Sequence, residues 1–91
     1  MWLIVYHQEL KNDVAQLPKN IRLRIQKAIE ERLLVDPISF GEPLRRVLKG
    51  YRKFRVGDYR LIYRLDKKTI IVLFLAHRKH VYDQFLKSSR R

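Results

Sequence analysis

Cysteine is absent from the 91-residue chain, which excludes disulfide bonds and cysteine-ligated zinc or iron. Glycine and proline number only three each, and no linker, repeat or low-complexity tract divides the chain. No apolar run approaches the roughly 18 residues that a membrane span requires. The apolar start at residues 2–6 also lacks the small-residue cleavage site of a signal peptide. We therefore expect one domain over residues 1–91, in the cytoplasm and without a membrane partner.

Acidic residues are few, since nine Asp and Glu stand against 21 Lys and Arg, for a net charge of +12. The imbalance is confined to one half of the chain. Residues 1–42 hold six basic and six acidic residues, whereas residues 43–91 hold fifteen basic and three acidic residues. Charge confined to one segment indicates a polyanionic partner, so we expect the second half to contact nucleic acid.

Hydrophobic spacing predicts the order of the elements. The apolar run at residues 2–6 favours a strand, and helical spacing follows, most clearly over residues 19–35. Residues 38–43 are expected to form a loop, and after Leu44 the apolar period changes from helical to alternating. We predict an α+β fold of strand–helix–helix–strands order, with two N-terminal helices on one face of a mainly antiparallel sheet of roughly four strands. A short segment with a frayed end should follow the last strand.

Gly57 and Asp58 predict a two-residue hairpin turn of type II′, because glycine stands first in the loop. Such a turn places Arg55 directly opposite Arg60 on the neighbouring strand. One face of this hairpin is apolar and is expected to pack against the helices. The other face, here called the cationic face, carries Tyr51, Lys53, Arg55, Arg60, Ile62 and Arg64.

The cationic face has two interpretations. Like charges opposite each other destabilise a sheet, so Arg55 and Arg60 form either a solvated surface with splayed side chains or a clamp for a phosphate. Cations beside an aromatic ring, here Tyr51, are typical of surfaces that bind single-stranded nucleic acid. Continued strand pairing across the next turn brings His77 near Asp58, at the edge of the cationic face. Capping of a strand end is the alternative role for His77.

A face rich in cations suits reactions that build negative charge on a phosphate. RNA carries its own nucleophile, the 2′-hydroxyl, so its cleavage needs anchoring, charge neutralisation and proton transfer, but no metal. The cationic face has no carboxylate pair for a two-metal site, and the chain has no Walker, GxSxG or HExxH motif. We therefore expect no metal or other cofactor, and slow chemistry that depends on a partner such as the ribosome.

Two segments, residues 48–64 and 76–82, resemble the RelE branch of the RelE/ParE toxin superfamily. The first contains Arg-Val-Gly-Asp-Tyr-Arg, and the second reads Ala-His-Arg-Lys-His-Val-Tyr. The family's order of elements also covers nearly the whole chain. RelE-type members are toxins of toxin–antitoxin pairs that cleave mRNA in the ribosomal A site. The resemblance implies a type II toxin that acts as a metal-independent endoribonuclease and inhibits translation, with a cognate antitoxin, the ribosome and mRNA as partners.

The resemblance also implies roles for single residues. The catalytic positions of the family match Lys53, Arg55, Arg60, Arg78 and Tyr82. Arg60 and Lys53 would stabilise the scissile phosphate. Arg78 would assist the leaving 5′-oxygen, and Tyr82 would orient the RNA or stack on it.

One departure from the family pattern concerns the general base. Arg55 stands where the family has a lysine, and arginine is a poor base because its pKa exceeds about 12. Lys53, His77, Tyr82 or ribosomal RNA would then have to accept the proton. We expect His77 to contact RNA as well, together with Tyr51 and Arg64.

Two other functions remain open. The ParE branch shares the fold but inhibits DNA gyrase, and it generally lacks the full cationic set with the late tyrosine. Arg60, Arg78 and Tyr82 together therefore favour RelE. The third candidate is a non-catalytic module that binds RNA or DNA through the same basic face.

Overall fold

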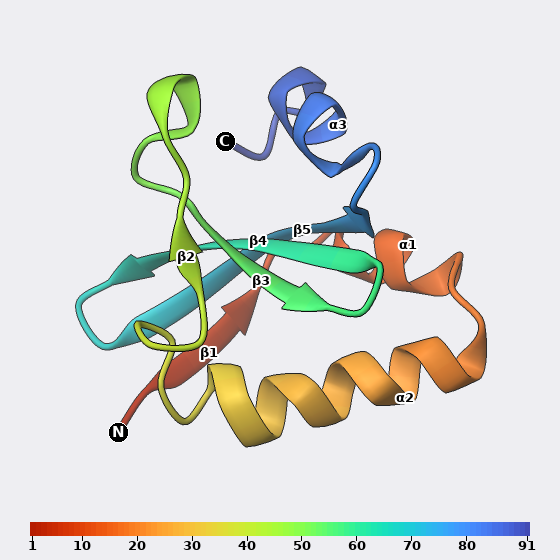
Figure 1. The fold of residues 1–91 in the computed structure, drawn as a ribbon, viewed down its shortest axis with the longest axis horizontal. Coiled ribbons are helices and arrows are strands. Elements are labelled where there is room, and N and C mark those ends of the chain that lie inside the picture. The colour runs from red at the N-terminus through yellow and green to blue at the C-terminus, as the bar shows by residue number, and fades with distance from the viewer.

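The computed structural model describes all 91 residues, and the chain folds around a five-stranded sheet (Figure 1). The elements are β1 (Leu3–Tyr6), α1 (Leu10–Ala15), α2 (Lys19–Ala28), η1 (Ile29–Leu33), β2 (Glu42–Pro43), η2 (Arg46–Leu48), β3 (Arg52–Val56), β4 (Tyr59–Asp66), β5 (Thr69–His77) and α3 (Val81–Lys87). The strands lie in the order β1-β5-β4-β3-β2, with β1 parallel to β5 and all other neighbours antiparallel. None of the helices has the length and apolar character needed to cross a membrane.

The α+β class is confirmed, but the element order differs in detail. A third helix, α3, forms where only a short segment was expected, and the count of four strands is one too low. The additional strand is β2, which lies inside the expected loop at residues 38–43. Its two residues pair with β3, Glu42 opposite Lys53 and Pro43 opposite Arg52. Proline is tolerated there because β2 is an edge strand, where a backbone N–H is not required for the ladder.

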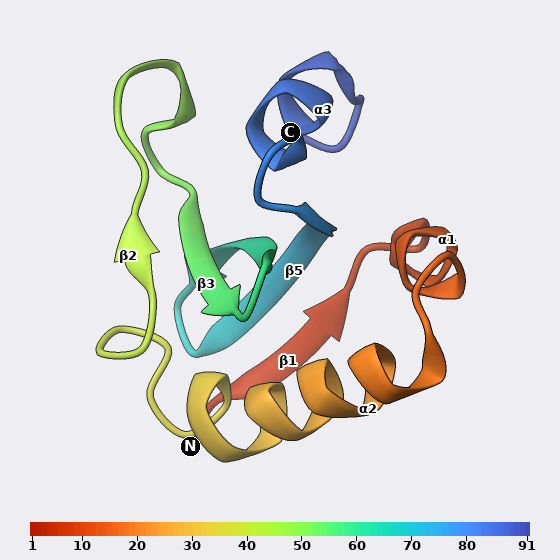
Figure 2. The same ribbon diagram turned by 45° about the vertical axis from the view of Figure 1, so that its right-hand side comes forward.

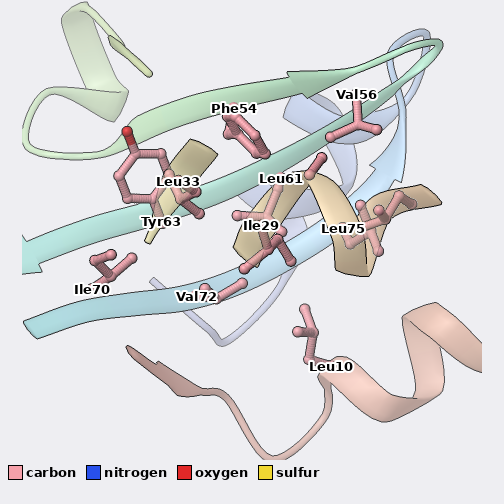
Figure 3. Close-up of a cluster of buried hydrophobic side chains, with 12 residues drawn as sticks. Leu10, Ile29, Leu33, Phe54, Val56, Leu61, Tyr63, Ile70, Val72 and Leu75 are labelled. Atoms are coloured by element: carbon pink, nitrogen blue, oxygen red, sulfur yellow. The ribbon is translucent and has the colours of Figure 1, made fainter. Parts of the chain in front are cut away.

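The sheet is covered on both faces rather than one (Figures 1 and 2). On the first face, α1, α2 and η1 pack over the predicted apolar side of the hairpin, which includes Phe54, Leu61 and Tyr63 (Figure 3). On the second face, α3 buries Val81 and Phe85 against Ile62 and neighbouring side chains. Val81 and Phe85 stand four residues apart, so one side of this short helix is apolar. The second face is the cationic face, and α3 covers part of it.

The hairpin register agrees with the prediction for every pair from Val56–Tyr59 to Arg52–Tyr63. Gly57 has a φ of +58°, as a type II′ turn requires at its first position. Arg55 and Arg60 therefore stand directly opposite each other.

The expected position of His77 is wrong by one residue, because β5 contains a bulge. Ile62 pairs with Phe74 and Tyr63 pairs with Val72, so Leu73 is an extra residue in β5. Beyond the bulge, His77 lies opposite Tyr59 rather than Asp58. Residues opposite each other share a face, so His77 lies on the first face and not on the cationic face.

The expectation of a frayed C-terminus is also wrong. Ser88 ends α3, and its hydroxyl accepts a hydrogen bond from the Arg90 backbone N–H. The Arg90 side chain is only 9% exposed and forms an ion pair with Asp13 of α1. The end of the chain is thus tied to the beginning of the fold.

Candidate nucleic-acid interface

A small cavity of about 150 Å³ opens on the cationic face beside the hairpin. It is lined by Phe40, Glu42, Lys53, Arg55 and Arg60. Three of these side chains are cations that the sequence predicted for the site. The cavity is smaller than the roughly 300 to 1,000 Å³ of pockets that hold whole small molecules, so it suits a group the size of a phosphate.

Arg60 is held in place by the hairpin turn. Its Nη1 donates hydrogen bonds to the carbonyl oxygens of Gly57 at 2.9 Å and Tyr59 at 3.0 Å. These bonds turn one edge of the half-buried guanidinium toward the turn carbonyls and leave Nε and Nη2 available to an anion. The strand across from it presents Arg55, which is exposed. The pair therefore supplies two positive charges beside one cavity, of which Arg60 is held in place by hydrogen bonds.

Glu42 is a carboxylate at this cavity that the sequence analysis did not identify. Its Oε2 lies 3.8 Å from Nζ of Lys53, and its side chain is 76% exposed. Glu42 of β2 pairs with Lys53 of β3, and this pairing places the two residues side by side. A two-residue strand has no periodicity, so no sequence signal could have assigned Glu42 to the site.

The segment before β2 is held by hydrogen bonds from Tyr63 and Arg52. The Tyr63 hydroxyl donates to the Pro37 carbonyl, and Arg52 Nη2 donates to the carbonyls of Ile38 at 2.8 Å and Gly41 at 3.2 Å. Arg52 Nε also donates to the Tyr63 hydroxyl at 3.2 Å. These bonds fix the backbone on either side of Phe40 and so fix one wall of the cavity.

Two side chains in and beside this supporting segment, Tyr63 and Asp36, have shifted pKa values. Burial raises the pKa of the Tyr63 phenol, although its hydrogen bond with Arg52 and the charge of that residue oppose the shift. Hydrogen bonds from the Ser39 side chain and backbone, and from the Ile38 N–H, lower the pKa of Asp36. The lowered pKa keeps Asp36 ionised, and its carboxylate caps the turn that leads into the cavity wall.

Arg78 lies at the hairpin end of the sheet. Its backbone N–H donates to the Asp58 carbonyl at 2.8 Å, and its Nε lies 4.0 Å from Asp58 Oδ1. The turn residue Asp58 thus places Arg78 beside the hairpin that carries Arg55 and Arg60. The Arg78 side chain is 55% exposed, so its guanidinium is accessible from solvent.

The other predicted residues take different positions. Tyr82 lies in the first turn of α3, half-buried against the second apolar cluster and on the same side of the sheet as the cationic face. Arg64 is exposed on β4. The Tyr51 ring packs edge-on against Phe85, with ring centroids 5.1 Å apart, so it belongs to the border of that cluster. The His77 ring contacts Tyr59 at a centroid distance of 5.7 Å, on the other face.

A basic projection extends beyond the cationic face. The connection between β2 and β3 rises on the same side of the sheet as α3 (Figures 1 and 2). Three exposed cations, none of them in an ion pair, lie along it: Arg45, Arg46 and Lys49. Arg46 has a φ of +57°, which is uncommon for a residue other than glycine. These cations enlarge the positive surface that a polyanion would meet.

Comparison with known proteins decides the family. Residues 4–82 match a family model described as ParE toxin of type II toxin-antitoxin system, parDE. The chain is also 35% identical to Toxin RelG of Mycobacterium tuberculosis over 74 residues. These residues cover 79% of this chain and 85% of the relative. The chain belongs to the RelE/ParE toxin superfamily. It is a toxin of a type II toxin–antitoxin system.

Other members agree with this assignment. Toxin RelE3 of Methanocaldococcus jannaschii is 31% identical over 85 residues, which cover 90% of this chain and 97% of the relative. The toxin–antitoxin complex RelBE2 of Mycobacterium tuberculosis contains a chain of the same fold, with a TM-score of 0.79 and 32% identity over 85% of this toxin and 98% of that chain. The predicted resemblance to the superfamily is therefore confirmed.

Proposed function

We propose that this toxin is a ribosome-dependent endoribonuclease that cuts mRNA without a metal ion. The observation that carries the proposal is the cavity where Lys53, Arg55 and Arg60 converge. Three cations around a space of phosphate size can bind a scissile phosphate and stabilise the charge that develops on it. The attacking group is the 2′-hydroxyl of the RNA itself, so the protein needs to position and neutralise rather than supply a nucleophile.

Each side chain takes a role that follows from its position. Arg60, held by the turn carbonyls, binds the phosphate through its free N–H groups, and Lys53 and Arg55 neutralise the same phosphate. Arg78, beside the hairpin turn, stabilises the leaving 5′-oxygen. Tyr82 orients the RNA from the first turn of α3.

The proton of the 2′-hydroxyl needs an acceptor. His77 is withdrawn as a candidate because it lies on the opposite face of the sheet. Arg55 stays charged at neutral pH and cannot accept it. Glu42 lines the cavity, and its carboxylate oxygens can accept a hydrogen bond and a proton, so we assign it the role of proton acceptor.

A cognate antitoxin is the proposed protein partner, as in the M. tuberculosis complex of a related toxin. An apolar groove of about 400 Å³ runs between α1 and α2, and it is bordered by Lys19 and Arg22. Its apolar lining includes Leu10, Val14, Leu17, Leu23 and Ile29. An amphipathic antitoxin segment with acidic flanks is complementary to this groove.

The test is mRNA cleavage on programmed ribosomes. We expect Arg60→Ala to lower the cleavage rate by about a hundredfold or more, because a cation that stabilises the transition state is lost. Glu42→Gln should also lower the cleavage rate, because the amide that replaces the carboxylate is a much poorer proton acceptor. Lys27→Ala, an exposed cation on α2 outside the cationic face, is the matched control and should cleave normally. An Arg60→Ala protein that melts as a folded domain and cleaves at the wild-type rate would refute the proposal.

Inhibition of DNA gyrase is the second candidate function, because the matching family model is described as a ParE toxin. The convergence of three cations on one small cavity favours RNA cleavage instead. A gyrase supercoiling assay with the same purified protein separates the two. Inhibition of supercoiling without mRNA cleavage would assign the toxin to the ParE activity.

A further inference from the structure

The Arg90 side chain, one residue from the end of the chain, is bonded on several sides. Its Nη1 and Nη2 donate to the two carboxylate oxygens of Asp13 at 2.6 Å and 3.0 Å. Nη1 also donates to the Leu73 carbonyl at 3.2 Å, and the guanidinium carbon lies 4.6 Å from the centre of the Phe74 ring. Such bidentate pairing fixes the guanidinium in orientation as well as in place.

Asp13 completes this arrangement from the side of α1. Its carboxylate accepts a third hydrogen bond, because Oδ2 also accepts from the Leu75 backbone N–H at 3.1 Å. Strand β1 ends opposite Val72, so β5 has no strand neighbour on this edge beyond that residue. Asp13 and Arg90 therefore satisfy the edge of β5 at its bulge and join α1, β5 and the C-terminal tail. We call the Asp13–Arg90 pair and its backbone contacts the tail clasp.

The tail clasp contributes less to the free energy of unfolding than a well-packed apolar pair in the same place would. The two side chains are 9% and 11% exposed, and burying a charge pair carries a desolvation penalty that an apolar pair avoids. The penalty is offset here because no buried side-chain polar atom lacks a hydrogen-bond partner. Buried ion pairs of this kind can specify one geometry, and the geometry specified here is the position of the tail that follows α3.

Helix α3 is held against the sheet by the fully buried side chains of Val81 and Phe85, and by the chain at each of its ends. It has seven residues, and a helix of this length is not stable by itself. Its first turn is connected to β5 through residues 78–80, where the His80 N–H donates to the His77 carbonyl at 2.9 Å. The tail clasp holds the chain that leaves the other end. Tyr82 belongs to α3, so its position depends on how the helix is held at its start by residues 78–80 and at its end by the tail clasp.

We propose that Asp13 and Arg90 are positioning residues for RNA cleavage, because the tail clasp fixes α3 and thereby the Tyr82 side chain against the cationic face. The inference rests on the proposed function. Neither residue lies at the cavity that binds the phosphate, so both act through α3 and not on the substrate. Loss of the clasp should leave RNA binding by the cationic face intact while Tyr82 loses its fixed orientation.

The experiment measures kcat and KM for mRNA cleavage on programmed ribosomes, using the full-length toxin. We expect Arg90→Ala to lower kcat by about tenfold to a hundredfold with little change in KM, as loss of positioning does. The matched control is Arg91→Ala, which removes the exposed neighbouring cation and should retain wild-type kcat. A melting curve for each variant establishes that it is folded.

A double-mutant comparison separates positioning from a general loss of stability. If the clasp acts through Tyr82, adding Arg90→Ala to Tyr82→Ala should cost nothing further in kcat. Asp13→Asn breaks the same clasp from α1 while keeping the side-chain shape, and it should lower kcat in the same way. If the Arg90→Ala protein does not fold, Asp13→Asn takes its place, both as the single variant and in combination with Tyr82→Ala.

The possible outcomes are distinct. Wild-type kcat in a folded Arg90→Ala or Asp13→Asn protein would overturn the inference and leave the proposed function standing. Losses that multiply in the Tyr82→Ala background would overturn the route through Tyr82. Absence of cleavage by the unmodified toxin, in contrast, would be a failure of the proposed function itself. A reduced kcat that is not lowered further in the Tyr82→Ala background supports the inference.

Discussion

At the level of single residues, the hairpin places two positively charged side chains next to each other. Arg55 and Arg60 stand directly opposite each other, a pairing that destabilises a sheet by some tenths of a kcal/mol. The carbonyl oxygens of Gly57 and Tyr59 accept hydrogen bonds from Arg60, which offsets that repulsion locally. From the sequence we would expect truncation of Arg60 to relieve repulsion only. The structure adds the loss of two hydrogen bonds, so the net change in stability should be small.

Tyr63 gives a prediction about pH. Burial raises its pKa above the ordinary tyrosine value of about 10, so the neutral phenol is favoured in the folded state. The stability that follows is fully present below about pH 10 and is lost as the pH rises through the raised pKa. Tyr63→Phe removes this titration but also the hydrogen bond to Pro37, at a cost on the order of 1 kcal/mol at neutral pH.

Urea denaturation at neutral and alkaline pH checks this prediction. The free energy of unfolding should fall more steeply above about pH 10 in the wild type than in Tyr63→Phe. The tyrosine Tyr6, whose pKa is also raised by burial and then by Glu30, remains in both proteins and does not affect the difference. Parallel curves for the two proteins would contradict the assignment of the shift to Tyr63.

At the scale of elements, the segment before β2 is shaped by one close approach. A Cβ atom on Gly41 would lie 1.7 Å from the Tyr63 hydroxyl oxygen and 3.1 Å from the Lys53 carbonyl. Tyr63 is fully buried and hydrogen-bonded, so it cannot move aside without cost. Gly41→Ala should therefore displace the segment that carries Phe40 and Glu42.

We expect Gly41→Ala to lower the free energy of unfolding by about 1–3 kcal/mol, as overpacking does. Val35→Ala, at a 64% exposed position near the start of the same connection, should change it by less than about 0.5 kcal/mol. Chemical denaturation measures both variants. Equal stabilities would mean that the close approach of Gly41 to Tyr63 is not maintained in solution.

The same elements show what could be predicted from the sequence. The hairpin was predictable residue by residue because Gly57 sets the turn and polar and apolar residues alternate on either side. The bulge at Leu73 was not predictable, because residues 70–76 are all apolar and an extra apolar residue leaves no mark in the pattern. Missing it moved His77 to the wrong face.

Contacts between distant segments account for the other errors. Strand β2 is defined by its pairing with Arg52 and Lys53, and two residues carry no period of their own. Asp13 and Arg90 are separated by 77 positions, and no local pattern connects them. The cluster of Lys53, Arg55 and Arg60 was predictable because strand alternation and one turn determine it. Glu42 was not predictable, because only the pairing of β2 with β3 places it at the cavity.

At the scale of the whole molecule, the positive charge gathers on the second half of the chain, which forms β3, β4, β5, α3 and the basic projection. Binding of single-stranded RNA to the free toxin should weaken with salt, with a slope of log K against log salt of about −0.7 for each neutralised phosphate. If each contacts one phosphate, removing Arg45 and Arg46 together should make the slope shallower by about 1.4. Titrations at several salt concentrations measure this, and an affinity independent of salt would contradict it.

The central claim is that the cationic face cuts mRNA held by the ribosome, and the ends of the cut mRNA test it most directly. Attack by the 2′-hydroxyl leaves a 2′,3′-cyclic phosphate on one fragment and a 5′-hydroxyl on the other. We expect 5′-hydroxyl ends that map within the A-site codon of ribosome-bound mRNA, and we expect these ends to be absent with Arg60→Ala. Intact mRNA on programmed ribosomes treated with the wild-type toxin would contradict it.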